Sequence, residues 1–218
     1  MRSSKTQIRT VACMAGLGLM FVQAAFAADK QPIRFNAADQ AAAKAATLKA
    51  ADLGAGWKGG AKKPDLSPDE DCPTKGSDLV ITGAAESKFD VQGVSVTSQS
   101  VVLQSRAMVA TDWQRTVGNA AFMACGRAVL MQRDDPKVRF VSFTKAAFPK
   151  LTPHAVRYRS VVDYAGTGDT VRAVVDLVLI AKGRTEISLI LTTLYSERAA
   201  ADVAERNLAR LLLSRVAA

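Results

Sequence analysis

Apolar and polar residues alternate in the middle of the chain in the way that β-strands require. Residues 85–91 place small or apolar side chains on one face and charged side chains on the other, which is typical of a half-buried strand. Gly93 separates this run from a second extended segment, residues 94–104. A glycine-containing connection this short predicts a β-hairpin.

Three other segments carry the three- and four-residue apolar spacing of helices. Asn36 followed by Asp39 suits a helix N-terminus, with an acceptor at the cap and an acid in the first turn, and predicts a helix to about Ala51. An apolar stripe predicts a second helix over residues 107–132. A third is predicted over residues 197–215.

The second half of the chain is predicted to be mostly strand. Residues 138–145, 156–164, 171–181 and 186–193 are rich in β-branched and aromatic residues. Short turns connect the last three, which predicts an antiparallel meander. The element order α-β-β-α-β-β-β-β-α predicts an α+β fold with a single antiparallel β-sheet and helices packed on one face.

The region between the first helix and the hairpin is predicted to be irregular. Glycines recur over residues 54–60 around Trp57, which predicts a flexible loop. Residues 61–77 are rich in proline, aspartate and lysine. We expect this stretch to be a tethered loop within one domain and not a linker between two domains.

The N-terminus has the three parts of a secretory signal peptide. Arg2, Lys5 and Arg9 are basic, residues 11–26 are mostly apolar, and Ala25-Phe26-Ala27 offers a cleavage pattern. An apolar run of about 16 residues is shorter than the roughly 20 that span a bilayer, so a retained anchor is the weaker alternative. We expect residues 1–27 to be removed and no integral membrane segment to remain.

Cleavage would leave residues 28–218 as a single α+β domain of ordinary size. The signal contains three basic and no acidic residues, so the net charge falls from +9 to +6. This dispersed excess favours anionic polymers or lipid headgroups. Scarce aromatic residues and the lack of a dense basic run exclude a nucleic-acid partner. The expected location is extracytoplasmic, with release and retention at the envelope both open.

Two cysteines remain after cleavage, Cys72 and Cys125. An even count in an oxidising compartment predicts a disulfide between them. Closing a loop of about 54 residues would stabilise the fold by roughly 4 kcal/mol. The alternative is two separate buried thiols. A metal site is not expected because His154 is the only histidine.

Several short motifs together resemble the extracellular sensor domain of some mycobacterial serine/threonine kinases and related actinobacterial exported proteins. They are Leu48, Ala51-Asp52-Leu53-Gly54, Trp57, Cys72-Pro73, Phe89, Cys125-Gly126 and Gly183-Arg184. The resemblance covers most of residues 45–215. It implies a curved antiparallel sheet with a cleft that senses an extracellular ligand.

This chain departs from the kinase sensor domains in two respects. We expect neither a kinase domain nor a transmembrane tether, and two cysteines are left after cleavage, one pair where the family pattern has two. The resemblance therefore implies a mode of ligand binding and does not extend to kinase signalling.

Residues able to carry catalysis are few. His154 lies between prolyl and alanyl neighbours in a predicted exposed loop, and no nucleophile elbow is present. Asp163 and Asp176 lie on predicted strands and could face one another, but strand acids usually lie on the solvated face. The carboxylates of residues 65–71 lack the spacing of a calcium loop. We predict no catalytic residue, no metal and no cofactor.

Arg157 and Arg159 form the most distinctive charged arrangement. Residues at i and i+2 of a strand project side by side about 7 Å apart, and two guanidinium groups so placed can bind phosphate or carboxylate. Arg139, Lys145 and Lys150 lie in neighbouring segments. The alternative is a solvated outer face on which the arginine stems cover apolar surface.

These features predict an exported, non-enzymatic, sensor-like or ligand-binding protein of the cell envelope. Its ligand would be anionic or small, and Arg157 and Arg159 are the predicted ligand-binding residues. One alternative is a protein–protein interaction module that docks onto an envelope protein. An uncharacterised hydrolase is a weaker alternative, since only the strand-face carboxylates favour it.

Overall fold

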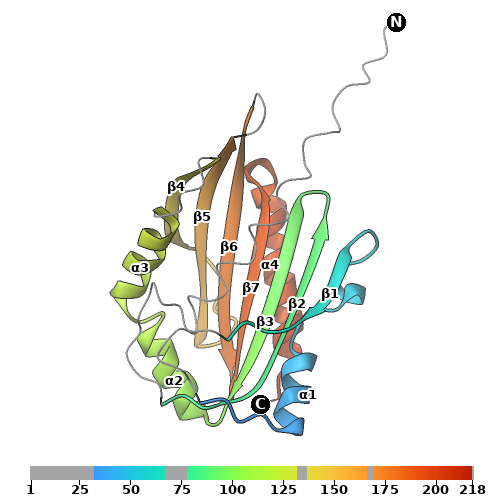
Figure 1. The fold of residues 1–218 in the computed structure, drawn as a ribbon, viewed down its shortest axis with the longest axis vertical. Coiled ribbons are helices and arrows are strands. Elements are labelled where there is room, and N and C mark those ends of the chain that lie inside the picture. Colours follow the sequence, from blue (N-terminus) through green and yellow to red (C-terminus); the bar gives the residue numbers. More distant parts are fainter. Residues whose placement is uncertain (1–31, 67–77, 132–136, 166–168, 218) are drawn as a thin grey trace, which may run out of the picture.

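A computed structural model of the chain describes residues 32–66, 78–131, 137–165 and 169–217. These residues form one seven-stranded sheet in the order β1-β2-β3-β7-β6-β5-β4, with helices packed against it (Figure 1). All six strand pairings are antiparallel, which confirms the predicted α+β class with a single antiparallel sheet. The elements are α1 (Ala37–Ala45), η3 (Ala50–Asp52), β1 (Lys58–Lys62), β2 (Ile81–Val91), β3 (Val94–Leu103), α2 (Arg106–Arg115), α3 (Ala120–Met131), β4 (Val138–Ala146), β5 (His154–Ala165), β6 (Thr170–Lys182), β7 (Thr185–Leu194), η4 (Tyr195–Glu197) and α4 (Arg198–Ser214).

The hairpin between β2 and β3 is present as predicted. Val91 pairs with Val94 across a two-residue turn. Gln92 and Gly93 have φ angles of 43° and 85°. Two successive positive φ angles are the signature of the turn that matches the twist of antiparallel strands. The meander β5-β6-β7 is confirmed in the same way by its pairings.

The helices pack on both faces of the sheet, whereas the sequence predicted that they pack on one face. Val178 and Ile180 of β6 belong to the core cluster that packs against α4. Leu177 and Leu179, which point to the opposite face, pack against Phe122 of α3. Figure 1 shows α4 behind the sheet and α2 and α3 along its β4 side. A strand that is apolar on both faces requires cover on both.

Strand β1 replaces part of the predicted glycine loop. Lys58–Lys62 pairs with residues 86–90 of β2, so the loop prediction is wrong for these residues. Gly59 permits the close pairing, because a Cβ atom there would lie 2.1 Å from the carbonyl oxygen of Lys88. Glycine in a strand often marks such an approach of one backbone to another. Its low strand propensity is why the pattern predicted a loop.

The predicted helix over residues 107–132 is in fact two helices, α2 and α3. Gly118 donates its N–H to the Trp113 carbonyl at 3.0 Å and ends the first helix. Asn119 then begins the second, since its side-chain oxygen accepts the Ala121 N–H at 2.9 Å. The apolar spacing continues across this break, so the periodicity alone could not reveal it.

The first helix begins as predicted and ends early. The Asn36 side chain accepts the Asp39 N–H at 2.9 Å and caps α1. The helix ends at Ala45 and not near Ala51. The Leu48 N–H donates instead to the Ser98 hydroxyl of β3 at 2.8 Å. This contact draws the chain onto the sheet and so stops the helix.

Strand β2 is buried on both faces, so the half-buried prediction is wrong. Glu86 is only 5% exposed and Lys88 only 6% exposed. The chain that follows β1 crosses the front of the sheet here (Figure 1). Within it, the Asp65 N–H donates to Glu86 Oε2 at 3.4 Å, and Gln99 donates to the Asp65 carbonyl at 3.0 Å.

Some sequence predictions fall outside the described residues. The signal peptide of residues 1–27, Cys72, and residues 166–168 of the predicted β5–β6 turn lie there. Among the helices that the structure describes, none has both the length and the apolarity needed to span a bilayer.

Candidate functional site

Arg157 and Arg159 lie on the face of β5 that α4 covers, and both are ion-paired. Arg157 Nη1 is 2.5 Å from Asp202 Oδ1 and 3.0 Å from Glu205 Oε2, both on α4. Arg159 binds Asp176 of β6 through two hydrogen bonds of 2.7 and 2.5 Å, and reaches Asp202 at 2.6 Å. The two guanidinium groups thus fasten α4 to the sheet.

The charges in this cluster nearly balance. Glu205 is fully buried, and this burial raises its pKa to about 9, so it is neutral at pH 7. Burial favours protonation of Asp202, but hydrogen bonds from Arg159 and Arg157 outweigh it and leave the Asp202 pKa lowered. Two cations therefore face the carboxylates of Asp176 and Asp202.

The cluster is neither an open cationic surface nor a solvated outer face. Arg157 is 5% exposed. Helix α4 covers the strand face that was predicted to be open to a ligand or to solvent. Oxygens of Asp176, Asp202 and Glu205 lie within 4.8 Å of one another, a spacing that would suit a cation. The guanidinium groups of Arg157 and Arg159 already neutralise these acids, so a metal cation is not needed there. We therefore assign the cluster a role in packing.

The other sequence candidates are also engaged within the fold. Asp163 is ion-paired with Arg172 at 2.7 Å and with Arg139. His154 begins β5 and is half-buried, with its ring 5.1 Å from the Trp113 ring, so the exposed-loop prediction for His154 is wrong. Asp69, Glu70 and Asp71 lie outside the described residues.

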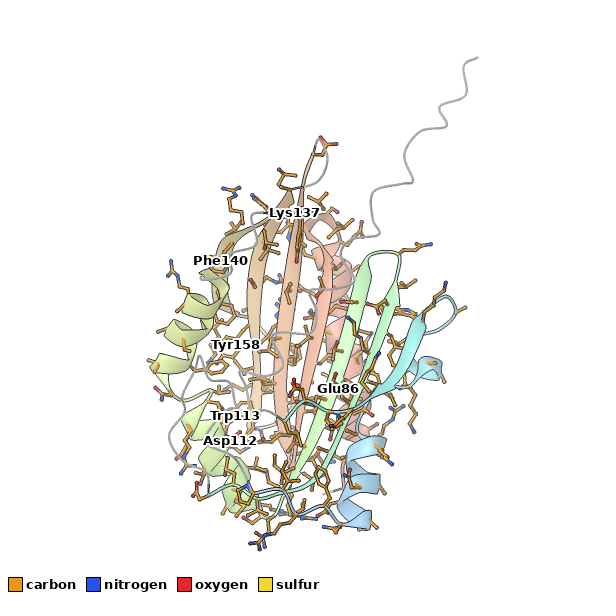
Figure 2. All side chains as sticks on the ribbon, viewed as in Figure 1. Glu86, Asp112, Trp113, Lys137, Phe140 and Tyr158 are labelled. Carbon is orange, nitrogen blue, oxygen red and sulfur yellow. The ribbon has the colours of Figure 1, made fainter. Side chains whose placement is uncertain are left out.

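A buried pair of acids, Asp112 and Glu186, was not predicted from the sequence. Asp112 projects from α2 toward Glu186 of β7, and burial raises the Asp112 pKa to about 6 and the Glu186 pKa well above its usual range. Figure 2 shows Asp112 beside Trp113 at the lower end of the sheet. The cavity at the pair is only about 10 Å³, too small for a substrate. Asp112 lies three positions after Val109, and these two are the buried residues of α2, so the predicted apolar stripe did not point to it.

A groove of about 960 Å³ lies at the β1–β2 edge of the sheet and is here called the edge groove. Residues 40–50, which comprise much of α1 and the segment after it, form one wall. Residues 59–66 form the other wall, and residues 84–89 of β2 form the floor. Ile33 and Phe35 extend the first wall.

The groove exists because two different segments cover the edge of β2. Strand β1 pairs with β2 only as far as Glu86. Further along the same edge, the Arg34 N–H donates to the Ile81 carbonyl at 2.8 Å. The Ala84 N–H donates to the Gln40 side chain of α1 at 3.2 Å. The space between these two covers is the groove.

The floor of the edge groove has its polar groups satisfied within the protein. Ser87 and Ser98 share a hydrogen bond of 3.0 Å, and Ser98 accepts the Leu48 N–H. Phe89 and Leu48 lie beneath the floor, each only 2% exposed. The apolar surface that a ligand would meet in the groove therefore comes chiefly from Ile33 and Phe35.

The rim of the edge groove is cationic. Lys44 and Lys49 border one side, and Lys62 and Lys63 border the other. All four lysines are exposed, and within the described part of the chain none of them forms an ion pair. These lysines could not be grouped from the sequence, because 13 or more positions separate the two pairs along the chain.

Two motifs behind the sensor-domain resemblance have clear structural roles. Trp57 packs on the core cluster beside α4. Gly183 forms the β6–β7 turn with a φ angle of 61°. Neither role is specific to one family, so the resemblance remains a prediction. No protein-family model matches this chain, and no curated protein is significantly similar to it.

Proposed function

We propose that this chain is an exported, non-enzymatic ligand-binding protein of the cell envelope that holds its ligand in the edge groove. One observation carries the proposal: the groove has a volume of about 960 Å³ and is lined by elements of one sheet edge and the helix beside it. Sites for small molecules and cofactors range over roughly 300–1,000 Å³ and are mostly apolar with a few placed polar groups.

The groove, and not the arginine pair, is the place where a ligand has access. Arg157 and Arg159 are held by the carboxyl groups of Asp176, Asp202 and Glu205 beneath α4. The lysines of the rim are exposed. The sensor-domain resemblance, which implies ligand binding in a cleft of a curved sheet, supports the same function.

Native mass spectrometry of residues 28–218, purified gently from the exporting host, tests the proposal. We expect a reproducible extra mass that leaves on denaturation. The Gly60→Phe variant fills the groove: Gly60 lines it, a Cβ there meets no atom within 4 Å, and its φ angle is ordinary. This variant is expected to lose the extra mass.

Ala199→Phe is the matched control, because Ala199 is exposed on α4 and does not line the groove. It is expected to retain the ligand. A protein without any bound mass would overturn the proposal. A Gly60→Phe protein with full occupancy would move the ligand to another site. A co-purified second polypeptide would favour an interaction module instead.

A further inference from the structure

The four lysines of the edge groove converge from two separate segments. Lys44 and Lys49 come from α1 and the chain that follows it, and Lys62 and Lys63 come from the end of β1. Like charges on both sides of a hollow reinforce one another and attract an anion. Lysine ammonium groups suit phosphate or carboxylate as compact point charges.

Two carboxylates lie in the same groove, and they do not cancel the lysines. Burial raises the pKa of Glu86, and this residue is 5% exposed. Glu86 accepts hydrogen bonds from the Asp65 N–H and from Gln99. Asp65 is the other acid, so four cations face at most two anions.

The groove presents exposed apolar side chains beside the lysine rim, and these favour an apolar group on the ligand. Ile33 and Phe35 are 50% and 46% exposed, and they are two of the four large apolar side chains that are exposed in the described residues. Both line the groove. Adjacent exposed apolar residues with a charged border are typical of ligand-binding surfaces.

The polar atoms of the floor do not favour a hydroxyl-rich ligand, because they already form hydrogen bonds within the protein. Ser87 is paired with Ser98, and the Gln40 oxygen accepts the Ala84 N–H. A sugar would therefore find few free partners there. An acyl chain would lose no hydrogen bond and would remove apolar surface from water at about 25 cal/mol per Å².

We infer that the edge groove binds a monomeric anionic amphiphile, with its apolar chain along the exposed Ile33 and Phe35 side chains and its acidic headgroup at the lysine rim. This inference rests on the proposed function in one respect, namely that the groove is the ligand site. A volume of about 960 Å³ accommodates a headgroup together with a chain.

Isothermal titration of residues 28–218 with matched probes tests the inference. The probes are tetradecanoic acid, tetradecanol and inorganic phosphate, at concentrations below micelle formation. We expect the acid to bind at least tenfold more tightly than the alcohol, which corresponds to about 1.4 kcal/mol. Phosphate alone is expected to bind weakly, since it lacks the chain.

The variant that tests the rim replaces Lys44, Lys49, Lys62 and Lys63 by alanine. Its affinity for the acid is expected to fall about tenfold or more, with the affinity for the alcohol unchanged. Lys145→Ala with Lys150→Ala is the control, because these exposed lysines lie at the β4 side of the sheet. This control is expected to bind both probes as the unchanged protein does.

The outcomes separate the two proposals. Equal binding of acid and alcohol, both lost in Gly60→Phe, would overturn the charge inference and leave the groove as the ligand site. Phosphate binding as tight as that of the acid would overturn the apolar part. Binding only to anionic vesicles would place the ligand at a membrane surface and overturn the inference. Absence of any bound mass from the host and of any probe binding would overturn the proposed function as well.

Discussion

Arg184 Nη2 lies 2.6 Å from Asp39 Oδ1, and this ion pair joins residues that are 145 positions apart in the chain. A second hydrogen bond of 3.1 Å makes the pair bidentate. Arg184 also donates to the Leu103 carbonyl at the end of β3. One guanidinium group therefore ties α1, the end of β3 and the β6–β7 turn together at one end of the sheet.

Replacing Asp39 by asparagine is expected to lower the free energy of unfolding by about 2 kcal/mol, the usual range for hydrogen bonds to charged groups. Urea denaturation at pH 7 measures this loss. Arg210→Ala on the exposed side of α4 is the control and should change stability little. An unchanged Asp39→Asn protein would show that the pair contributes nothing.

The same pair predicts a loss of stability in acid. The hydrogen bond from Arg184 lowers the pKa of Asp39 from 3.8 to about 2, against the opposing effect of burial. Stability from a lowered carboxyl pKa is present above the unfolded pKa and disappears as the pH falls toward the folded pKa. We expect this contribution to fade between about pH 4 and pH 2, and to be missing in Asp39→Asn.

Gly59 and Gly60 form a matched pair of backbone positions. A Cβ at Gly59 would overlap the Lys88 carbonyl oxygen, and Gly59 has a φ angle of 135°. Gly59→Ala is therefore expected to destabilise the protein by about 3 kcal/mol. Gly60→Ala should lie within about 0.5 kcal/mol of the unchanged protein. Thermal unfolding compares the two, and equal effects would contradict the close pairing of β1 with β2.

Glu205 predicts a dependence on pH in the opposite direction. Burial is the main cause that raises its pKa from 4.5 to about 9. A carboxyl with a raised folded pKa contributes stability below its unfolded pKa, and this is lost as the pH rises toward the folded value. Stability should therefore decline between about pH 5 and pH 9. Glu205→Gln, which mimics the neutral acid, should flatten part of this decline in urea titrations at several pH values.

Glu197→Gln is the control for Glu205, because Glu197 is exposed at the start of α4. It should leave the slope of stability against pH unchanged. An identical slope in Glu205→Gln and in the unchanged protein would show that Glu205 titrates normally.

The pairing of Cys72 with Cys125 stays a prediction, since Cys72 lies outside the described residues. Thiol titration of unfolded exported protein should find no free thiol. Cys125→Ser is then expected to cost roughly 4 kcal/mol of stability, because it opens a loop of about 54 residues. One reactive thiol at each of Cys72 and Cys125 would show that the disulfide does not form.

Local pattern was a good guide wherever one element decides its own conformation. The two-residue alternation located most of β2, the extended run after Gly93 located β3, and Asn36 marked the start of α1. Boundaries failed where distant contacts intervene. Leu48 leaves the helical path for Ser98, and Gly59 joins a strand because its backbone lies against Lys88.

The candidate site was far less predictable. Arg157 and Arg159 were identified as neighbours on one strand face, but their partners Asp202 and Glu205 lie 43 to 48 positions away. Helix α4 covers the face of β5 on which these arginines lie, and the strand pattern could not show this cover. The edge groove gave no sequence signal, since its lysines and apolar residues are unremarkable within their own segments.

The amino-acid sequence by itself determined six of the seven strands, the approximate helices and the α+β class, because backbone preference and hydrophobic period act over a few neighbouring residues. Only the tertiary structure decided which charges are neutralised and where a hollow remains. Those properties depend on which segments meet: Asp202 meets Arg157 under α4, and α1 faces β1 across the edge of β2. Such meetings are set by packing the whole chain, and no local pattern encodes them.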